Sequence, residues 1–375
     1  MRLLIGLLPL VFAGPTFGGS YYVAPGGDAN PGTLERPFAT LHRAQQSARE
    51  RPGSVFLRGG THYLQETLVF SAEDSGTRAA PFVYQAYGDE QPVISGGIRL
   101  EALDWQAYRD GIYQANVPAD LQTEEIFVNG ERQILARYPN FDPSAQYFDG
   151  FAEDAISKER VTRWADPAGG YFHAMHPALW GDFTWRITGK DGQGGVTMEG
   201  GWQNNRTGAV HEKIRFVENV FEELDAPGEW FLDGETHTLY FYPPSGLDLA
   251  SATVEATRLR CLVEFRGTET QPVRFVTLRG LTFRHRRARS WTPRSRCCGR
   301  IGRSIAVERF SSKARKIVRS RTVSSIRSAG TRSSSTITTA ASRCAAAGSP
   351  KPGPAASVSS ATHRRRGIRC SITVR

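Results

Sequence analysis

Four acidic residues near the start of the chain are the first candidates for chemistry: Glu73, Asp74, Asp89 and Glu90. Cleavage of a glycosidic bond needs two carboxyl groups about 5 to 10 Å apart, one protonated and one ionised. Both pairs, however, stand beside Gly or Ser, where an acidic side chain usually stabilises a turn. We therefore expect turn-forming carboxylates here and assign no catalytic or substrate-binding residue from the sequence.

A second candidate is the pair His173 and His176, which are three residues apart. On a helix such a pair could share a metal ion. No third ligand and no helical pattern accompany them, so we expect no metal site. The sequence also lacks a phosphate-binding loop, a dinucleotide fingerprint after a strand and a nucleophile elbow, so no cofactor is expected.

Tryptophan is the third candidate, because its large apolar face can stack on a sugar ring. Core packing is the ordinary role of a tryptophan, so we expect only one or two of six to bind carbohydrate. Asn205 also begins an N-glycosylation sequence, which matters only in a eukaryotic secretory pathway. These six are the tryptophans of residues 101–252: Trp105, Trp164, Trp180, Trp185, Trp202 and Trp230.

Charge divides the 375 residues into two compositions. The whole chain carries a net charge of +10, which would suit a polyanion such as nucleic acid. Residues 284–375, however, hold 23 Lys and Arg and a single acid, Glu308, whereas residues 1–283 hold 24 basic and 36 acidic residues. The basic excess therefore belongs to the tail alone.

The first residues have the form of an export signal. Arg2 is followed by an apolar run, residues 3–13, and then by small residues. This run is shorter than the roughly 20 residues that span a bilayer. We expect a signal peptide over residues 1–19 and a secreted or periplasmic protein without a membrane span; an uncleaved anchor or buried hairpin is the alternative. Cys261 is the sole cysteine of residues 20–283, which excludes a disulfide within them.

Residues 20–100 alternate short strands with turns. The spacing of Leu41, Ala44 and Ala48 predicts a helix over residues 40–51, ended by Pro52. Strands this short need neighbours stacked on them to bury a core, as in a parallel β-helix whose open N-terminal end the helix would cap. A β-sandwich remains the alternative. The expected strands cover residues 21–25, 55–57, 67–70, 81–87 and 92–96.

Residues 101–252 differ from this pattern. They are rich in tryptophan and contain a hairpin signal, residues 229–232 and 238–242 around Asp233-Gly234. We interpret them as an inserted β-rich domain. Short apolar strands resume over residues 253–283, at 262–265, 273–278 and 281–283.

These motifs resemble, in their order, the exported right-handed parallel β-helix proteins of the glycoside hydrolase family 141 type. Residues 21–33, 37–41, 73–77 and 92–97 resemble the first coils, and residues 127–130, 136–140, 228–231 and 238–243 resemble that family's insertion domain. The resemblance implies activity on polysaccharides, including fucosidase and xylanase activity. It places the catalytic carboxylates on later coils, beyond the residues that match here.

Residues 284–375 resemble no further coil. They contain 20 Arg and 18 Ser but no Leu, Asp, Asn, Gln, Met or Tyr, which removes both core and turn residues. We expect an unstructured basic tail, and we infer a reading-frame shift in a GC-rich gene near codon 284. A genuine Arg/Ser-rich tail is the alternative.

The sequence thus predicts an exported, glycoside hydrolase-like protein with a polysaccharide substrate, truncated and inactive as written. A non-catalytic carbohydrate-binding or scaffold protein is the second reading. A polysaccharide lyase is the third, although it would need a calcium-binding acid cluster and a basic Arg or Lys on one coil, which are not found. Nucleic acid binding by the tail is disfavoured by export, and the oligomeric state is not indicated.

Overall fold

The computed structural model describes residues 19–26, 29–202, 207–268, 270–287 and 368–374. Most of these residues lie in or between β-strands, with short helices among them, so the expected all-β class is confirmed at this level. Nearly all of the expected signal peptide, the glycosylation acceptor Asn205 and residues 288–367 of the tail lie outside the described residues.

Helix α1 (Leu41–Glu50) forms where its apolar spacing predicted it. The hydroxyl of Thr40 accepts a hydrogen bond from the Arg43 amide at 3.2 Å and caps the first turn. Leu41, Ala44 and Ala48 are buried on one face of the helix. This face packs on strands β1 (Gly19–Val23) and β2 (Gly53–Leu57). The predicted helix over residues 40–51 is confirmed.

The strands of residues 19–95 and 263–284 pair with one another in parallel, in three ladders. They are β1 (Gly19–Val23), β2 (Gly53–Leu57), β3 (Gly60–Tyr63), β4 (Leu68–Phe70), β5 (Phe82–Ala86), β6 (Pro92–Ser95), β21 (Val263–Phe265) and β22 (Val276–Arg284). One ladder runs β1, β2, β5, β22, a second β3, β6, β22, and the third pairs β4 with β21. Successive segments of the chain thus lie next to one another as paired parallel strands. We call the three ladders together the stack.

The interior of the stack is apolar because residues that pair in register on successive strands are buried together. Val55, Tyr84 and Leu278 stand opposite one another on β2, β5 and β22 and are fully or almost fully buried. Burying one such side chain contributes about 1.5 to 3 kcal/mol. Strand β3 was not predicted, since it contributes His62 rather than an aliphatic residue to the interior.

Strand β22 replaces the two separate strands expected at residues 273–278 and 281–283. Its register shifts between Leu278 and Leu281, around Gly280, whose φ of 68° suits a residue without a Cβ. The first half of β22 pairs with β5 and the second half pairs with β6, so this one strand belongs to two of the three ladders.

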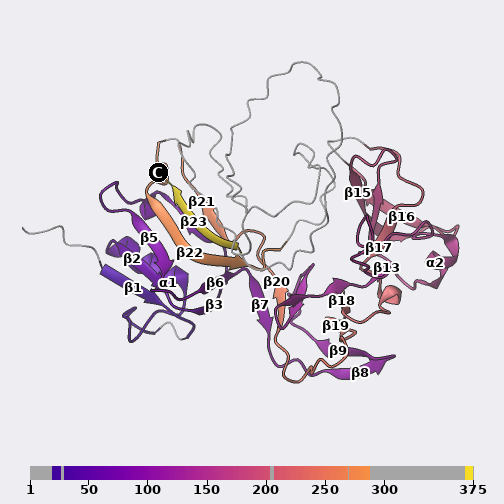
Figure 1. Ribbon diagram of the computed structural model, residues 1–375, viewed down its shortest axis with the longest axis horizontal. Coiled ribbons are helices and arrows are strands. Elements are labelled where there is room, and N and C mark those ends of the chain that lie inside the picture. Colours follow the sequence, from indigo (N-terminus) through magenta and orange to yellow (C-terminus); the bar gives the residue numbers. More distant parts are fainter. Residues whose placement is uncertain (1–18, 27–28, 203–206, 269, 288–367, 375) are drawn as a thin grey trace, which may run out of the picture.

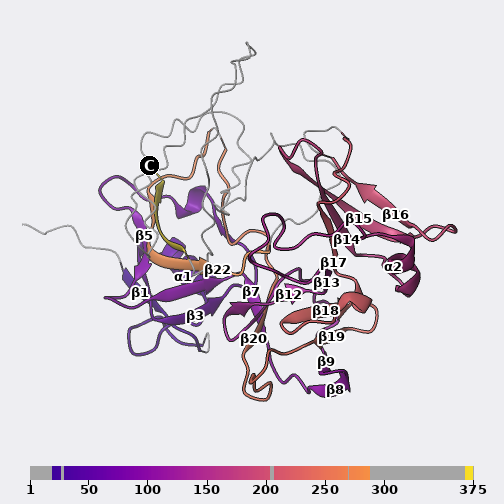
Figure 2. The ribbon, with the colours of Figure 1, turned by 45° about the vertical axis from the view of Figure 1, so that its right-hand side comes forward.

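Strand β23 (Ile368–Val374) corrects the expectation that the whole tail lacks structure. It pairs antiparallel with β22 along residues 276–283 and lies beside it in Figures 1 and 2. The exposed edge of β22 offers backbone donors and acceptors, and residues 368–374 include the β-branched Ile368, Ile372, Thr373 and Val374 that favour a strand.

Three largely antiparallel sheets hold residues 97–257. The junction sheet contains β7 (Gly97–Leu100), β10 (Ile126–Val128), β11 (Glu131–Arg132) and β20 (Val254–Thr257). The middle sheet contains β8 (Gln106–Arg109), β9 (Ile112–Asn116), β12 (Ile134–Leu135), β18 (Glu229–Asp233) and β19 (Thr238–Phe241). The outer sheet contains β13 (Arg137–Tyr138), β14 (Tyr171–Met175), β15 (Asp182–Lys190), β16 (Val196–Gly200) and β17 (Arg215–Glu218).

These sheets extend away from the stack. Figures 1 and 2 place the stack at one end of the described structure, the outer sheet at the other, and β7 and β20 between them. The predicted hairpin is present as β18 and β19, whose turn is closed by Asp233 accepting from the amides of Glu235 and Thr236. Helix α2 (Lys158–Arg163) packs Val161 into the core of the outer sheet.

Candidate functional site

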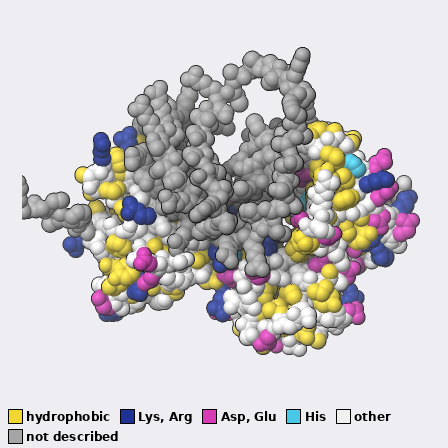
Figure 3. Space-filling model, viewed as in Figure 1, with side chains coloured by type: hydrophobic (Ala, Val, Ile, Leu, Met, Phe, Trp, Pro, Cys, Tyr) yellow, Lys and Arg dark blue, Asp and Glu magenta, His cyan; other side chains and the backbone are white. Residues whose placement is uncertain are grey.

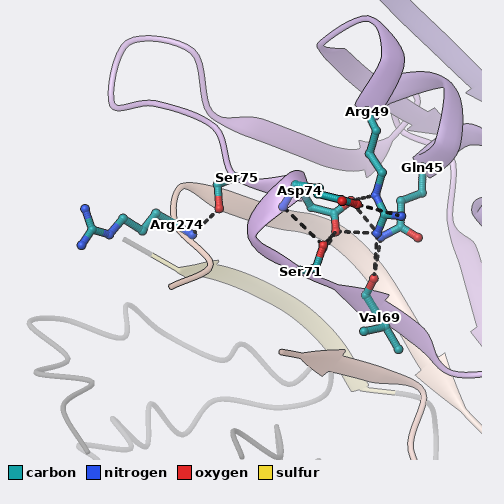
Figure 4. A network of polar contacts seen from close by, with 8 residues as sticks. Gln45, Arg49, Val69, Ser71, Asp74, Ser75 and Arg274 are labelled. Atoms are coloured by element: carbon teal, nitrogen blue, oxygen red, sulfur yellow. Dashed lines mark hydrogen bonds and ion pairs between the residues drawn. The ribbon is translucent and has the colours of Figure 1, made fainter. Parts of the chain in front are cut away.

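The first expected acids stabilise a turn, as the sequence predicted. Asp74 ends a short 3-10 helix, η1 (Ala72–Asp74), and its carboxylate is completely buried (Figure 4). It accepts hydrogen bonds from Arg49 Nε and Nη2, both at 2.8 Å, from Gln45 Nε2 at 3.0 Å and from the Ser71 amide at 2.6 Å. The bonds from Arg49 and Gln45 attach α1 to the stack, and the bond from Ser71 caps η1, so the carboxylate is fully engaged in structural contacts.

The second pair of acids lies in the turn after β5. Glu90 accepts hydrogen bonds from Arg58 Nε at 2.8 Å and from the Gly59 amide, which lies in the turn of the neighbouring ladder segment. These hydrogen bonds hold the pKa of Glu90 below its usual range, and the bond from the Gly59 amide has the largest effect. Asp89 beside it is exposed. Glu90 therefore joins two turns of the stack.

The two histidines do not form a metal site. They lie on and after strand β14, not on a helix, and their contacts differ. His173 Nε2 is 3.0 Å from Glu218 Oε1 and its Nδ1 is 3.1 Å from the Thr184 hydroxyl, whereas His176 packs against Trp180. Burial alone would raise the pKa of Glu218, but His173, Arg137 and Arg132 together outweigh it and lower that pKa. Within the described ranges, no group of three or more His, Cys, Asp or Glu side chains could hold a metal ion.

The six tryptophans divide by exposure. Trp164 and Trp230 are buried in the cores of the outer and middle sheets, and Trp105 and Trp185 are half-buried against the same cores. Trp180 is 51% exposed and Trp202 is 36% exposed. Two of six therefore present surface to solvent.

A polar cluster that sequence patterns did not reveal lies where the stack meets the junction sheet. Tyr63, Ser95 and Arg284 stand side by side across β3, β6 and β22. Opposite them, Glu255 on β20 lies between Phe127 on β10 and Arg99 on β7. We call Tyr63, Ser95, Arg99, Glu255, Arg284 and His285 the junction cluster.

Hydrogen bonds connect the centre of this cluster. The Tyr63 hydroxyl donates to Glu255 Oε1 at 2.6 Å, and His285 Nδ1 is 3.5 Å from the same oxygen. His285 Nδ1 is also 3.1 Å from the Ser95 hydroxyl, and its ring lies on Phe127 with centroids 4.3 Å apart. The Nε2 atom of His285 is buried without a hydrogen-bond partner.

Burial controls the protonation of these groups. It raises the pKa of Tyr63, and the bond to Glu255 adds to this effect, so the phenol keeps its proton. Burial also lowers the pKa of His285 and favours the neutral ring, although Glu255 opposes the shift. A phenol, a carboxylate and a neutral imidazole in contact can hold and transfer one proton. Glu255 and His285 are each only 7% exposed, so acid–base chemistry on a ligand would have to pass through the half-buried Tyr63.

Two arginines add positive charge at the edge of the cluster. Both Arg99 and Arg284 lie close enough to Tyr63 to lower its pKa in part. Across the described residues, neither guanidinium group has a hydrogen bond or ion pair; Arg99 is exposed and Arg284 is half-buried. Because Tyr63 and Glu255 are 192 residues apart, no motif in the sequence could have identified this cluster.

Glu229, at the start of β18, is a buried carboxyl with a raised pKa. Burial raises the pKa of Glu229 to about 8, and the nearby Asp225 carboxylate adds to this, while the amides of Asp225 and Ala226 oppose it. Its Oε1 is buried without a partner. Shifted carboxyls often mark active sites, but Glu229 is only 2% exposed and no substrate can reach it. We interpret it as a structural group of the middle sheet.

Comparisons with known proteins find similarity to a glycoside hydrolase and to a pectate lyase. No family model matches the chain. A solved structure described as a glycoside hydrolase superposes with a TM-score of 0.59 at 25% identity, covering 72% of this chain and 51% of that one. The mostly β architecture therefore resembles that of a glycoside hydrolase.

Two curated proteins are similar in sequence. Pectate lyase PEL9 of Emericella nidulans is 24% identical over 249 residues, 63% of this chain and 55% of that protein. The uncharacterized protein YwoF of Bacillus subtilis is 42% identical over 76 residues, 20% of this chain and 15% of that protein. The chain spans about half the length of the glycoside hydrolase and of the lyase. In the described residues, no helix is long and apolar enough to cross a membrane.

Proposed function

We propose that the chain is a secreted or periplasmic polysaccharide-processing protein of the glycoside hydrolase type, built on a right-handed parallel β-helix. The structural similarity to a glycoside hydrolase, at a TM-score of 0.59, carries this proposal. The three parallel ladders, the capping position of α1 and the apolar interior support it. In the proposed organisation, a signal peptide (1–19) precedes coils (20–100), an insertion (101–252), resumed coils (253–283) and a tail (284–375).

The order of strand pairing supports an inserted domain. The chain leaves the ladders after β6 and, on its return, β21 and β22 pair with β4, β5 and β6. Residues before and after the insertion thus build one continuous core, which includes Ile94 and Leu281. This is the arrangement expected when a domain interrupts successive coils.

A polysaccharide lyase is the second candidate, because of one specific feature of the junction cluster. Elimination from a uronate needs positive charge near the sugar carboxylate and a group that accepts the adjacent proton. Arg99 and Arg284 supply such charge beside the Tyr63–Glu255 pair. The similarity to a pectate lyase favours the same reading. No calcium-binding acid cluster accompanies it in the part of the chain that is described.

We further propose that codons after 284 are read in a shifted frame. The proposal rests on composition: 20 Arg and 18 Ser with no Leu or Asn among residues 284–375. Under it, the catalytic carboxylates that the family resemblance places on later coils are absent from the translated chain, which binds polysaccharide without cleaving it.

Gene sequencing and a polysaccharide panel test both proposals. We expect sequencing to show a frame that, when restored, encodes further β-rich coils; an uninterrupted gene without such coils in any frame would contradict the shift. Xylan, polygalacturonate and fucoidan are then assayed with the chain and with its frame-restored form. We expect both forms to bind at least one polysaccharide and the restored form to release new reducing ends.

Each other result has a defined meaning. Products that absorb in the ultraviolet as unsaturated uronates would replace the hydrolase by the lyase. Binding without cleavage by the restored form would favour a non-catalytic carbohydrate-binding protein. Absence of both binding and cleavage would contradict the proposed function.

A further inference from the structure

The loop between β14 and β15 presents an exposed tryptophan in a fixed position. Trp180 packs against His176 with ring centroids 4.1 Å apart and the ring planes tilted by 39°, although 51% of Trp180 is exposed. His176 is itself held, because its Nδ1 accepts a hydrogen bond from the Ala178 amide at 3.0 Å and its own amide donates to the Gly181 carbonyl at 2.8 Å. The indole therefore rests on a ring that the loop backbone orients.

This tryptophan ends a row of aromatic rings that begins in the core. Phe172 contacts Trp185, Trp185 contacts Phe183, and Phe183 contacts His176, at centroid distances of 5.3, 5.8 and 6.1 Å. Phe172 and Phe183 are buried. Because each ring packs on the next, the exposed face of Trp180 loses little conformational freedom when a ligand covers it.

The surroundings of Trp180 are polar and have unused hydrogen-bonding capacity. Over the described residues, neither the indole N–H of Trp180 nor the exposed carboxylate of Asp182 has a hydrogen-bond or ion-pair partner. The register of β15 and β16, with Gly201 donating to the Thr184 carbonyl, brings Trp202 to the same end of the outer sheet. Figure 3 shows hydrophobic side chains gathered beside a histidine at that end.

We propose that Trp180 is a carbohydrate-binding platform on which one sugar ring of a polysaccharide stacks. An apolar ring face with polar groups at its edge matches a pyranose, whose C–H face is apolar and whose rim carries hydroxyl groups. The indole N–H and Asp182 would bond to those hydroxyls. Stable protein interfaces bury about 800 Å² on each partner, far more than the exposed surface of Trp180 and Leu179 provides, so a protein partner is not favoured.

This inference rests on the proposed function and adds a binding site at the outer sheet, separate from the junction cluster. The platform would hold a long substrate and leave the bond-cleaving groups elsewhere. Replacing Trp180 should therefore weaken binding of long chains without changing the chemistry at any cleavage site.

Affinity gel electrophoresis and calorimetry with the full chain test the platform, using xylan, polygalacturonate and fucoidan as probes. We expect Trp180→Ala to weaken binding of the recognised polysaccharide at least about tenfold, as for a buried aromatic anchor. Trp180→Phe should retain part of the affinity. Tyr108→Ala is the matched control, because Tyr108 is 41% exposed on β8 of a different sheet.

The outcomes separate this inference from the proposed function. Weaker binding by Trp180→Ala, with an unchanged melting temperature and an unaffected Tyr108→Ala variant, supports the platform. If wild type and Trp180→Ala bind equally, the platform is wrong while the proposed function stands. If the wild-type chain and its frame-restored form neither bind nor cleave any probe, the proposed function fails and the platform fails with it.

Discussion

The hydroxyl of Tyr63 donates a 2.6 Å hydrogen bond to the carboxylate of Glu255 and so connects the parallel stack to the junction sheet. The two residues are separated by 192 positions and lie on opposite sides of the proposed insertion. This bond fixes how the inserted sheets are attached, and it provides the one carboxylate of the junction cluster with a donor.

Removing the phenol hydroxyl should therefore weaken the attachment. We expect Tyr63→Phe to lower the free energy of unfolding by about 1 to 3 kcal/mol, because the buried Glu255 carboxylate loses a hydrogen bond. Urea unfolding followed by fluorescence measures the change. Tyr22→Phe is the control, since the hydroxyl of half-buried Tyr22 has no hydrogen-bond partner within the described ranges; an equal loss in both variants would contradict the role of the bond.

Asp74 should be needed for attachment of α1. Asp74→Asn removes the charge that pairs with Arg49 and places an amide N–H₂ among buried donors, which we expect to cost about 1 to 3 kcal/mol because the Arg49 side chain is itself 34% exposed. Glu73→Gln, next along the chain, changes a side chain that is 75% exposed and 3.7 Å from Arg49, and should cost almost nothing. Thermal unfolding of the two variants distinguishes these contributions, and similar melting temperatures would show that the buried pair is unimportant.

Glu229 should make the protein less stable as the pH rises. Its pKa in the folded protein is about 8, above the value of about 4.5 in an unfolded chain, so its contribution is complete below pH 4.5 and is lost as the pH rises through 8. Glu229→Gln removes the charge, and we expect it to be more stable than the wild type at pH 8 by about 1 to 3 kcal/mol. Near pH 4 the two should differ much less.

Melting temperatures measured between pH 4 and pH 9 check this prediction. Glu235→Gln changes an exposed carboxyl on the same hairpin and should leave the pH profile unchanged. If Glu229→Gln lowered stability equally at every pH, the hydrogen bonds of the carboxylate would outweigh its burial.

A fall in pH should destabilise the protein through its buried histidines. Burial lowers the pKa of both His285 and His62 below that of an exposed histidine, so the stability they contribute is present above about pH 6.5 and is lost as the pH falls. We expect His285→Asn to flatten the fall in unfolding free energy between pH 7 and pH 5. Denaturant titrations at pH 7 and pH 5 measure this fall in unfolding free energy. An unchanged fall in the variant would show that the folded state does not protect His285 from protonation.

Sequence periodicity predicted the individual helices and strands better than it predicted the junction cluster. Helix α1 has a clear apolar spacing and a Thr40 cap, and the strands around Val55 and Phe82 are bounded by turn residues. The roles of Asp74 and Glu90 followed from their turn-forming neighbours. The junction cluster could not be predicted, because its members become neighbours only when β20 and β22 return to the stack. Strand β3 was missed because its buried residue, His62, is polar.

The pairing of β22 with β5 and β6 has a consequence for synthesis of the protein. The edges of β5 and β6 emerge from the ribosome long before residues 276–284, which cover them. At about 5 to 20 residues per second, these edges stay open for on the order of ten seconds or more. During that interval the backbone groups of these edges are open to pairing with other strands, so they need shielding until residues 276–284 have been synthesised.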